Sequence, residues 1–414
     1  MTHGSPVRLF LDLGPLRDAP SFRRLWVGQS LSGIGSQMTN FAVSLQIYTL
    51  TRSSLAVGAT GLAVAVPAVV FGLLGGSVAD AVDRRKLVLV TGSLQAAMSV
   101  ALAAQAFAGM SRVWPLYVLV ALQSTASSIA TPTRRTFTAV LLPPRQVPAG
   151  AALTSISFQA SLIAGPALAG LVTAASGLKV CYLLDAISFS AALYGTGRLP
   201  AMPPTGGVTR PGPRAVAEAI RFAYRSKILC GALLTDLNAT VLGMPFGVFP
   251  AINAAHFGGS TGTLGLLTAA PAIGGVLGTA LSGPITRVSR QGRAQLVASA
   301  VWGGAVAAFG VTRALPLAVF LLMIAGAADV TNVVFRTSMV QLTTPDSHRG
   351  RVSAAEYVIG AGGSQLGNFR AGAVASLTSP ATSALTGGLA TVAGATLIAL
   401  TLPAFTRYRA RSHA

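Results

Sequence analysis

The chain has 414 residues, of which 52% are apolar and only 10% are charged, and its mean hydropathy is +0.64. An ordinary soluble domain carries about 25% charged residues, so this composition excludes a water-soluble enzyme. The 46 glycines and 23 prolines lie inside long apolar runs without a tripeptide period, which excludes collagen-like and disordered chains as well. The sequence therefore predicts a polytopic membrane protein.

Apolar runs between clusters of charge predict twelve membrane-spanning helices. A span needs about 20 residues to cross a hydrocarbon core of about 30 Å, so the chain has room for twelve spans joined by short loops. The expected spans are residues 24–49, 56–79, 87–109, 114–133, 150–176, 180–198, 228–254, 263–285, 294–312, 315–335, 353–376 and 382–404.

A polar stretch at residues 199–227 divides these spans into two sets of six. It is rich in Pro and Gly, which indicates a linker, and residues 214–226 carry apolar side chains on one helical face, which indicates a short amphipathic helix on the membrane surface. The other expected segments are an N-terminal segment (1–23), two six-helix bundles (24–198 and 228–405) and a basic tail (406–414).

The basic residues predict the orientation. If the N-terminus is cytoplasmic, 25 of the 30 Lys and Arg residues fall in cytoplasmic segments and four fall in outer loops, as the positive-inside rule requires. We therefore expect a plasma-membrane protein (inner membrane in a Gram-negative cell) with both termini in the cytoplasm. The net charge of +20 then reflects topology and contact with lipid, and nucleic acid is not an expected partner.

The two sets of spans carry a weak internal repeat. A shift of 201 residues lays Arg135 over Arg336, and each follows the fourth expected span of its half. A shift of 202 residues lays residues 165–170 over residues 367–372, and both segments begin and end with Gly. Secondary transporters are commonly built from two related halves, so the repeat favours an all-α protein with two pseudo-symmetric six-helix bundles.

The turn between the second and third expected spans carries a specific motif. It reads Gly75-Gly76-Ser77-Val78-Ala79-Asp80-Ala81-Val82-Asp83-Arg84-Arg85-Lys86. Glycines permit close helix contact, an aspartate at a helix end accepts hydrogen bonds, and basic residues hold the turn at the inner leaflet. The motif resembles the signature of the major facilitator superfamily. The corresponding turn of the second half keeps Gly283 but has Arg287 where the acid would be.

A narrower resemblance covers nearly the whole chain. Residues 22–26, 83–86, 248–251 and 344–351 are similar to the enterobactin (siderophore) exporter branch of this superfamily and related actinobacterial efflux proteins. The resemblance implies alternating access by two bundles around a central site, powered by proton antiport.

The same resemblance implies roles for two groups of residues. It implies a cytoplasmic gate, although Arg135 and Arg336 could instead anchor the protein at lipid headgroups. It also implies a helix-kink element typical of exporters in the fifth span, where ordinary helix packing is the alternative. The gate residues are Gly76, Asp80, Asp83, Arg84, Arg85, Arg135 and Arg336, and the kink residues are Gly165, Pro166 and Gly170.

Charged side chains at membrane depth are costly, so each is a functional candidate. Asp236 lies about 12 Å into the seventh expected span, and Asp329 about 21 Å into the tenth from its outer end. Either is a candidate proton carrier, with an interhelical hydrogen bond as the alternative role. Arg370, in the eleventh span, is a candidate for substrate contact or for a permanent ion pair. Asp185 and Glu356 are expected near the membrane interface.

Other functions fit the sequence less well. The four His residues lie in tails or loops, and the two Cys lack metal-ligand spacing, so we expect no enzyme, metal site or cofactor. The chain has no phosphate-binding loop for ATP, although a separate ATPase subunit could supply one, and a channel would give no proton-driven accumulation. We expect a monomeric, proton-coupled exporter of a small amphipathic molecule such as a siderophore, in contact with lipid. A macrolide or multidrug pump and an importer are the alternatives.

Overall fold

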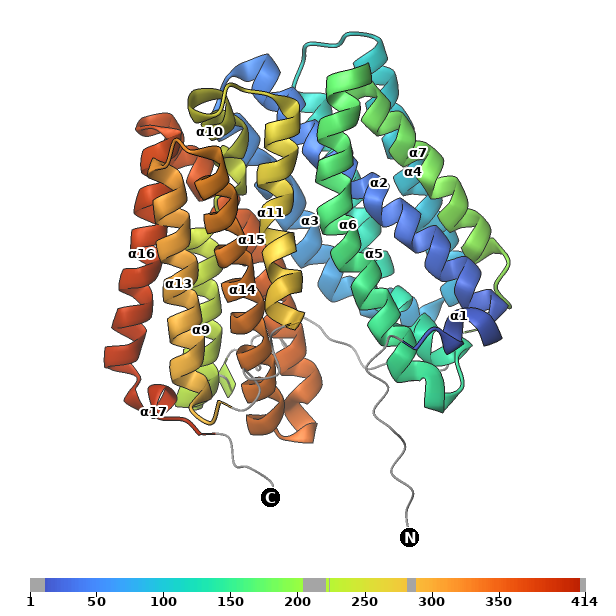
Figure 1. The fold of residues 1–414 in the computed structure, drawn as a ribbon. Helices are drawn as coiled ribbons and strands as arrows, with labels where there is room; N and C mark the ends of the chain where they lie inside the picture. Colours follow the sequence, from blue (N-terminus) through green and yellow to red (C-terminus); the bar gives the residue numbers. More distant parts are fainter. Residues whose placement is uncertain (1–11, 204–220, 223, 281–287, 410–414) are drawn as a thin grey trace.

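The computed structural model describes residues 12–203, 221–222, 224–280 and 288–409, and these residues form helices without any strand (Figure 1). The predicted amphipathic helix at 214–226 lies largely outside the described residues. The first half contains α1 (Gly14–Asp18), α2 (Pro20–Thr51), α3 (Ser54–Ala81), α4 (Arg84–Phe107), α5 (Trp114–Leu141), η1 (Pro144–Gln146), α6 (Val147–Ser176) and α7 (Leu178–Gly197). The second half contains α9 (Lys227–Gly243), η2 (Phe246–Val248), α10 (Phe249–His256), α11 (Thr261–Ala280), α13 (Gln291–Val311), α14 (Leu315–Thr343), α15 (Asp346–Leu377), α16 (Pro380–Thr401) and α17 (Pro403–Thr406).

Each expected span overlaps helical structure. Among the described residues, nine segments are long and apolar enough to cross a membrane. The three expected spans outside that set correspond to α2, α5 and α15, which have 28 to 32 residues each and are long enough to cross by length. The predicted all-α polytopic membrane fold is confirmed.

The seventh expected span is not one continuous helix. Helix α9 ends at Gly243, and the chain continues through Met244, Pro245 and η2 into α10. Met244 is extended, with φ −76° and ψ 117°, because the residue before a proline is sterically disfavoured in the helical region. Residues 227–256 still form one candidate membrane span, as expected, but the helix is interrupted at this point.

Several helices begin at side chains that satisfy their first free amides. Ser53, Ser226 and Ser379 accept hydrogen bonds from the backbone of α3, α9 and α16 at 3.3, 3.4 and 3.0 Å. Asp83 accepts one from the Lys86 amide of α4 at 3.0 Å. Such caps contribute about 1 kcal/mol each and fix where a helix leaves its turn.

The two halves of the chain meet through close helix crossings at the end remote from the termini, here called the far side (Figure 1). Helix α3 crosses α15 where a Cβ added at Gly58 would lie 2.8 Å from the Asn368 carbonyl oxygen and 3.2 Å from the Gly372 Cα. Helix α6 crosses α11 where a Cβ at Gly170 would lie 2.7 Å from the Thr261 carbonyl oxygen. Glycine lets both pairs of backbones touch.

Buried apolar clusters show the same asymmetry between the two ends. The largest cluster joins both halves, for example through Val57 of α3 and Ile252 of α10. Clusters nearer the termini stay within one half, one containing Val88 and Phe137 and another containing Leu229 and Val340. The halves therefore form a common core at the far side and diverge toward the side of the termini, as Figure 1 shows.

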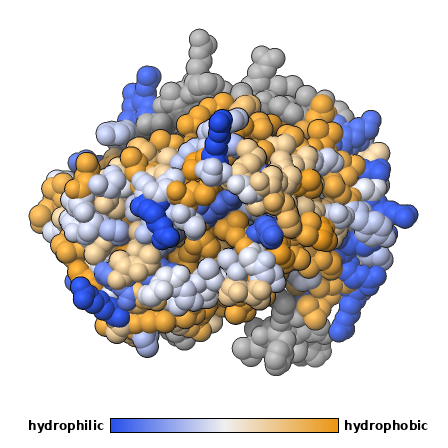
Figure 2. All heavy atoms as spheres, turned by 90° about the horizontal axis from the view of Figure 1, so that it is seen from above, coloured by the Kyte–Doolittle hydropathy of each residue, from blue (hydrophilic) through white to orange (hydrophobic). Residues whose placement is uncertain are grey.

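The surface seen from the far side is mainly apolar. Figure 2 shows hydrophilic side chains there in separate spots among apolar and weakly polar residues. Many large apolar side chains on the helices are also exposed, including Leu171, Leu397 and Leu400 at 64%, 61% and 75%. Side chains of this kind on a helical exterior face lipid in a membrane protein, which agrees with the composition.

Candidate functional site

One arginine is shared by two carboxylates where α9, α14 and α15 meet. Arg336 on α14 forms an ion pair with Asp236 on α9 between its Nη1 atom and the carboxylate Oδ2 atom. The Arg336 Nε atom lies 3.5 Å from the Oε1 atom of Glu356 on α15. The Arg336, Asp236 and Glu356 side chains are only 13%, 3% and 17% exposed. Buried charges require partners of this kind, so the three groups act as one electrostatic unit.

This unit lies deep within its helices. Asp236 is about 14 Å from the start of α9 at Lys227, and Glu356 is about 15 Å from the start of α15 at Asp346. The sequence places Arg336 just beyond a span and Glu356 near the interface. Helix α14 continues past Arg336 to Thr343, and α15 begins seven residues before its expected first residue, so both side chains lie farther inside a helix than the expected span bounds place them. The position of Glu356 relative to the membrane interface stays a prediction.

Asp329 adds a third carboxylate to the region. It precedes Arg336 by two turns on the same face of α14 and interacts electrostatically with both Asp236 and Arg336. Asn332 lies between them on this face, is 1% exposed, and its Oδ1 atom has no hydrogen-bond partner among the described residues. The structure therefore brings both predicted proton carriers together around one arginine.

The charges of this cluster do not balance when every group is ionised. Three carboxylates then surround one guanidinium, so the cluster carries two negative charges in excess. An unpaired charge at membrane depth is expensive, and a carboxylate removes that cost by taking up a proton. The arrangement is chemically suited to bind and release protons.

Arg370 forms no ion pair with a carboxylate among the described residues. Its Nη2 atom donates a hydrogen bond of 2.5 Å to the carbonyl oxygen of Leu242, close to the end of α9. The carbonyls of the last helical turn have no partner within their own helix, and a cation there is favourable. In this conformation Arg370 therefore caps the broken seventh span, beside Gly387 of α16.

Asp185 forms a separate polar centre in the first half. Its side chain is fully buried on α7 and accepts hydrogen bonds of 2.7 Å from Thr39 of α2 and Ser99 of α4. Ser36 of α2 lies at 3.5 Å. No ion pair involves Asp185 in the described part of the chain. Asp185 lies seven residues inside α7, and the hydroxyls spaced along two other helices are the only sequence signal for this hub.

The predicted gate motif makes local contacts within the first half. Asp83 accepts hydrogen bonds from the backbone of Lys86 and of Met202, and the two amides lower its pKa below the ordinary value. Arg85 donates a hydrogen bond of 2.5 Å to the carbonyl of Gly197 at the end of α7. The Arg84 amide donates to the Met202 carbonyl at 3.1 Å. These bonds attach the turn to α7 and to the start of the linker.

The remaining gate residues are placed as follows. Gly76 and Asp80 lie in α3, but their side chains are outside the described part of the structure. Arg135 lies inside α5 and is exposed, whereas its neighbour Arg134 donates a hydrogen bond of 3.0 Å to Gln95 of α4. A gate role for Arg135 and Arg336 stays a prediction.

The kink element of α6 lies at two helix contacts. A Cβ added at Gly165 would lie 2.3 Å from the Gln37 Cβ of α2, and the Pro166 carbonyl oxygen would lie 2.7 Å from a Cβ at Gly265 of α11. Helix α6 is continuous through Pro166 from Val147 to Ser176. The repeat match of Gly170 with Gly372 gains a structural meaning, because each glycine meets the other half of the chain at the far side.

Known transporters are similar to this chain along its length. A profile of the transmembrane secretion effector family matches residues 11–413. The enterobactin exporter EntS of Citrobacter koseri is 24% identical over 399 residues, which are 96% of this chain and 96% of that protein.

Solved structures share the fold. A peptide transporter POT in complex with sulfate has a TM-score of 0.75 at 12% identity, with 94% of this chain and 96% of that chain covered. A bacterial homologue of the iron transporter ferroportin in an inward-facing state has a TM-score of 0.68 at 16% identity, with 94% and 98% covered.

The helical architecture, the buried charges and these similarities agree with one another. The matched region includes both halves of the chain and every helix described above. The chain belongs to the transmembrane secretion effector family of the major facilitator superfamily and is a multi-pass membrane transporter.

Proposed function

We propose that this transporter exports a small amphipathic molecule in exchange for protons. The observation that carries the proposal is the sharing of Arg336 by Asp236 and Glu356 at membrane depth, with Asp329 nearby. The excess negative charge of this cluster gives a proton a binding place that does not depend on any histidine.

The ion pairs fit one particular step of the cycle. Both Asp236 and Glu356 contact Arg336 here, so the cluster has the geometry of its deprotonated form. Protonation of Asp236 neutralises one partner and frees Arg336 from α9. Because α9, α14 and α15 all meet at this cluster, a proton changes how these three helices hold one another.

The closed far side fits an inward-facing state. We propose that the termini are cytoplasmic, as the distribution of Lys and Arg indicates, so that the diverging ends of the halves open toward the cytoplasm. The two halves then act as the two moving bundles, joined by residues 199–227, and a monomer is sufficient. In the exporter direction, substrate enters from the cytoplasm, and protons arriving from outside promote its outward release.

The substrate class rests on the relatives. Several similar proteins are named enterobactin exporters, so a siderophore or another secreted natural product is the first candidate. A macrolide or other drug is the second, because a shared fold does not determine the cargo. Apolar helices with a few buried amides, such as Asn332, suit an amphipathic molecule better than a sugar.

Inside-out vesicles that contain the purified protein test this proposal. With an acidic lumen, labelled enterobactin, a macrolide and an amino acid are offered outside, and uptake is followed with and without a protonophore. We expect uptake of an amphipathic compound that ceases when the gradient collapses. Uptake that proceeds only with the opposite gradient identifies an importer, and uptake that ignores the gradient rejects proton coupling.

A further inference from the structure

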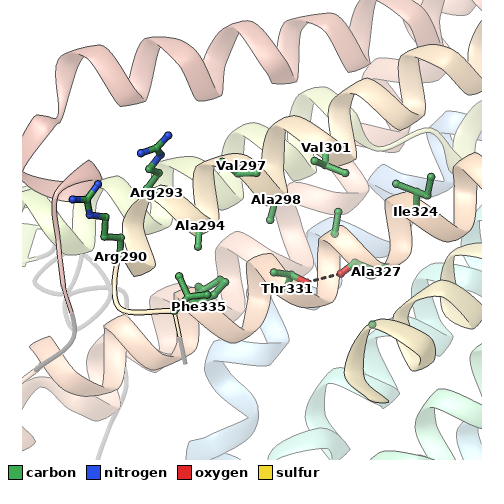
Figure 3. Close-up of a pocket in the computed structure, with 13 residues that line it drawn as sticks. Arg290, Arg293, Ala294, Val297, Ala298, Val301, Ile324, Ala327, Thr331 and Phe335 are labelled. Atoms are coloured by element: carbon green, nitrogen blue, oxygen red, sulfur yellow. Dashed lines mark hydrogen bonds between the residues drawn. The ribbon is translucent and has the colours of Figure 1, made fainter. Parts of the chain in front are cut away.

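An open hollow of about 710 Å³ lies between α13 and α14 of the second half (Figure 3), and Gly278 of α11 also lines it. Its walls are apolar along most of their length and include Val297 and Val301 of α13 and Ile324 of α14. Cavities of about 300–1,000 Å³ are typical of sites that hold a discrete ligand.

The walls offer almost no hydrogen bonds to a ligand. The lining residues all belong to the described part of the chain, and Thr331 carries the only hydroxyl among them. Its Oγ1 atom donates to the Ala327 carbonyl of its own helix at 2.8 Å, the contact drawn as a dashed line in Figure 3. An occupant of this part of the hollow is therefore held by apolar contact.

One end of the hollow is cationic. Arg290 and Arg293 lie there at the start of α13, and both are exposed (Figure 3). Neither forms an ion pair with any described residue, and the sequence contains no Asp or Glu between Asp236 and Asp329. Arg290 is also the N-cap of α13, where the helix dipole adds positive potential. Within the described part of the chain, both charges are therefore without a counter-ion.

The length of the hollow matches one leaflet of a bilayer. Arg290 and Val301 are separated by eleven residues of α13, a rise of about 17 Å. Half of a hydrocarbon core is about 15 Å thick. With Arg290 at headgroup level on the side of the termini, the apolar walls reach to about the middle of the membrane.

We propose that this hollow binds an anionic phospholipid, with the phosphate between Arg290 and Arg293 and an acyl chain along α13 and α14. The two unpaired cations, the apolar walls and the length of one leaflet together fit a lipid. A soluble anion leaves the apolar walls empty, and a neutral lipid leaves the arginine charges uncompensated. Basic pockets between helices at the inner membrane surface bind anionic headgroups in the same way.

Native mass spectrometry of the purified full-length protein tests the proposal. The protein is equilibrated with equal amounts of phosphatidylglycerol and phosphatidylcholine of identical acyl chains. We expect wild-type protein to retain phosphatidylglycerol, and R290Q/R293Q to bind it about 30-fold more weakly, as the loss of two headgroup charge contacts requires. The matched control R407Q/R409Q removes two exposed arginines outside the hollow and should retain it.

A second pair of variants tests the acyl-chain part of the site. Val297→Trp fills the hollow from a side chain that is 55% exposed, whereas Leu400→Trp enlarges a 75% exposed side chain outside it. Only Val297→Trp should lower lipid retention. Three results overturn the proposal: equal retention of both lipids by the wild type, equal loss in both arginine pairs, or equal retention of glycerol 3-phosphate, which has no acyl chain.

Discussion

Arg336 of α14 is paired with Asp236 of α9, although their positions in the sequence differ by 100. The pair is buried, and Glu356 of α15 shares the same guanidinium at 3.5 Å. A single side chain thereby ties three helices of the second half together. This relationship changes the role expected of Arg336 from a residue of the loop to the centre of the proposed coupling site.

Removal of Arg336 should destabilise the protein more than removal of its partner. Arg336→Gln leaves Asp236 and Glu356 buried without a cation, and breaking a buried pair in this way costs about 3–5 kcal/mol. We expect a clear loss of thermal stability in detergent, partly restored in the double variant Arg336→Gln/Asp236→Asn. If the double variant loses as much thermal stability as Arg336→Gln and Asp236→Asn lose together, the two residues do not interact.

The glycine crossing between α6 and α11 should be required for closure of the far side. In Gly170→Val the new side chain meets the Thr261 carbonyl and the Gly265 Cα, and overpacking costs about 1–3 kcal/mol. We expect transport to fall about tenfold or more, with the far side more open by spin-label distances. Gly304→Val is the control, because a Cβ at Gly304 meets nothing within 4 Å. Equal effects of the two variants speak against the crossing as a gate.

Asp185 should hold the first half together without taking part in proton coupling. Asp185→Leu leaves the buried hydroxyls of Thr39 and Ser99 without their acceptor, at about 1–3 kcal/mol for each unsatisfied group. Asp185→Asn keeps one acceptor oxygen and should lose less thermal stability. A loss of pH-driven transport in a folded Asp185→Asn protein contradicts this assignment.

Acid should loosen the attachment of the linker to the first half. The amides of Lys86 and Met202 favour the ionised form of Asp83 and hold its pKa below 3.8. The contribution of Asp83 to the attachment of the linker is therefore fully present above its ordinary pKa, and it is lost as the pH falls through the lower pKa of the folded protein. We expect proteolysis next to Met202 to increase below about pH 4. Asp83→Ala should be cleaved faster than the wild type already at neutral pH. If its cleavage depends on pH in the same way as that of the wild type, Asp83 is not the cause of the acid effect.

Local sequence patterns predict the helices well but not their ends. Hydropathy falls at the first charged residue, so the tenth span is expected to stop before Arg336, whereas α14 continues for two more turns because Arg336 faces a partner inside the protein. Charged residues at the start of α15 lower the local hydropathy in the same way, so the sequence does not show how far inside the helix Glu356 lies. Helix formation depends on local hydrogen bonds, which charged residues do not interrupt.

The members of the site are harder to predict than the helices. Depth in a span selects Asp236 and Asp329, because a charge at membrane depth needs a reason. The sharing of Arg336 by Asp236 and Glu356 depends on how α9, α14 and α15 rotate against one another, which no single helix encodes. In the sequence, Pro245 indicates that a helix ends near Gly243. The hydrogen bond from Arg370 to the end of that helix, however, depends on the packing of α15 beside α9.

The most direct test of the account measures proton movement driven by substrate. Vesicles with an acidic lumen and an internal pH dye receive a transported compound from outside, and the loss of lumenal protons is recorded for the wild type, Asp236→Asn and Asp185→Asn. We predict proton release with the wild type and Asp185→Asn and none with Asp236→Asn. Undiminished proton release by folded Asp236→Asn protein would show that the cluster around Arg336 does not couple transport to protons.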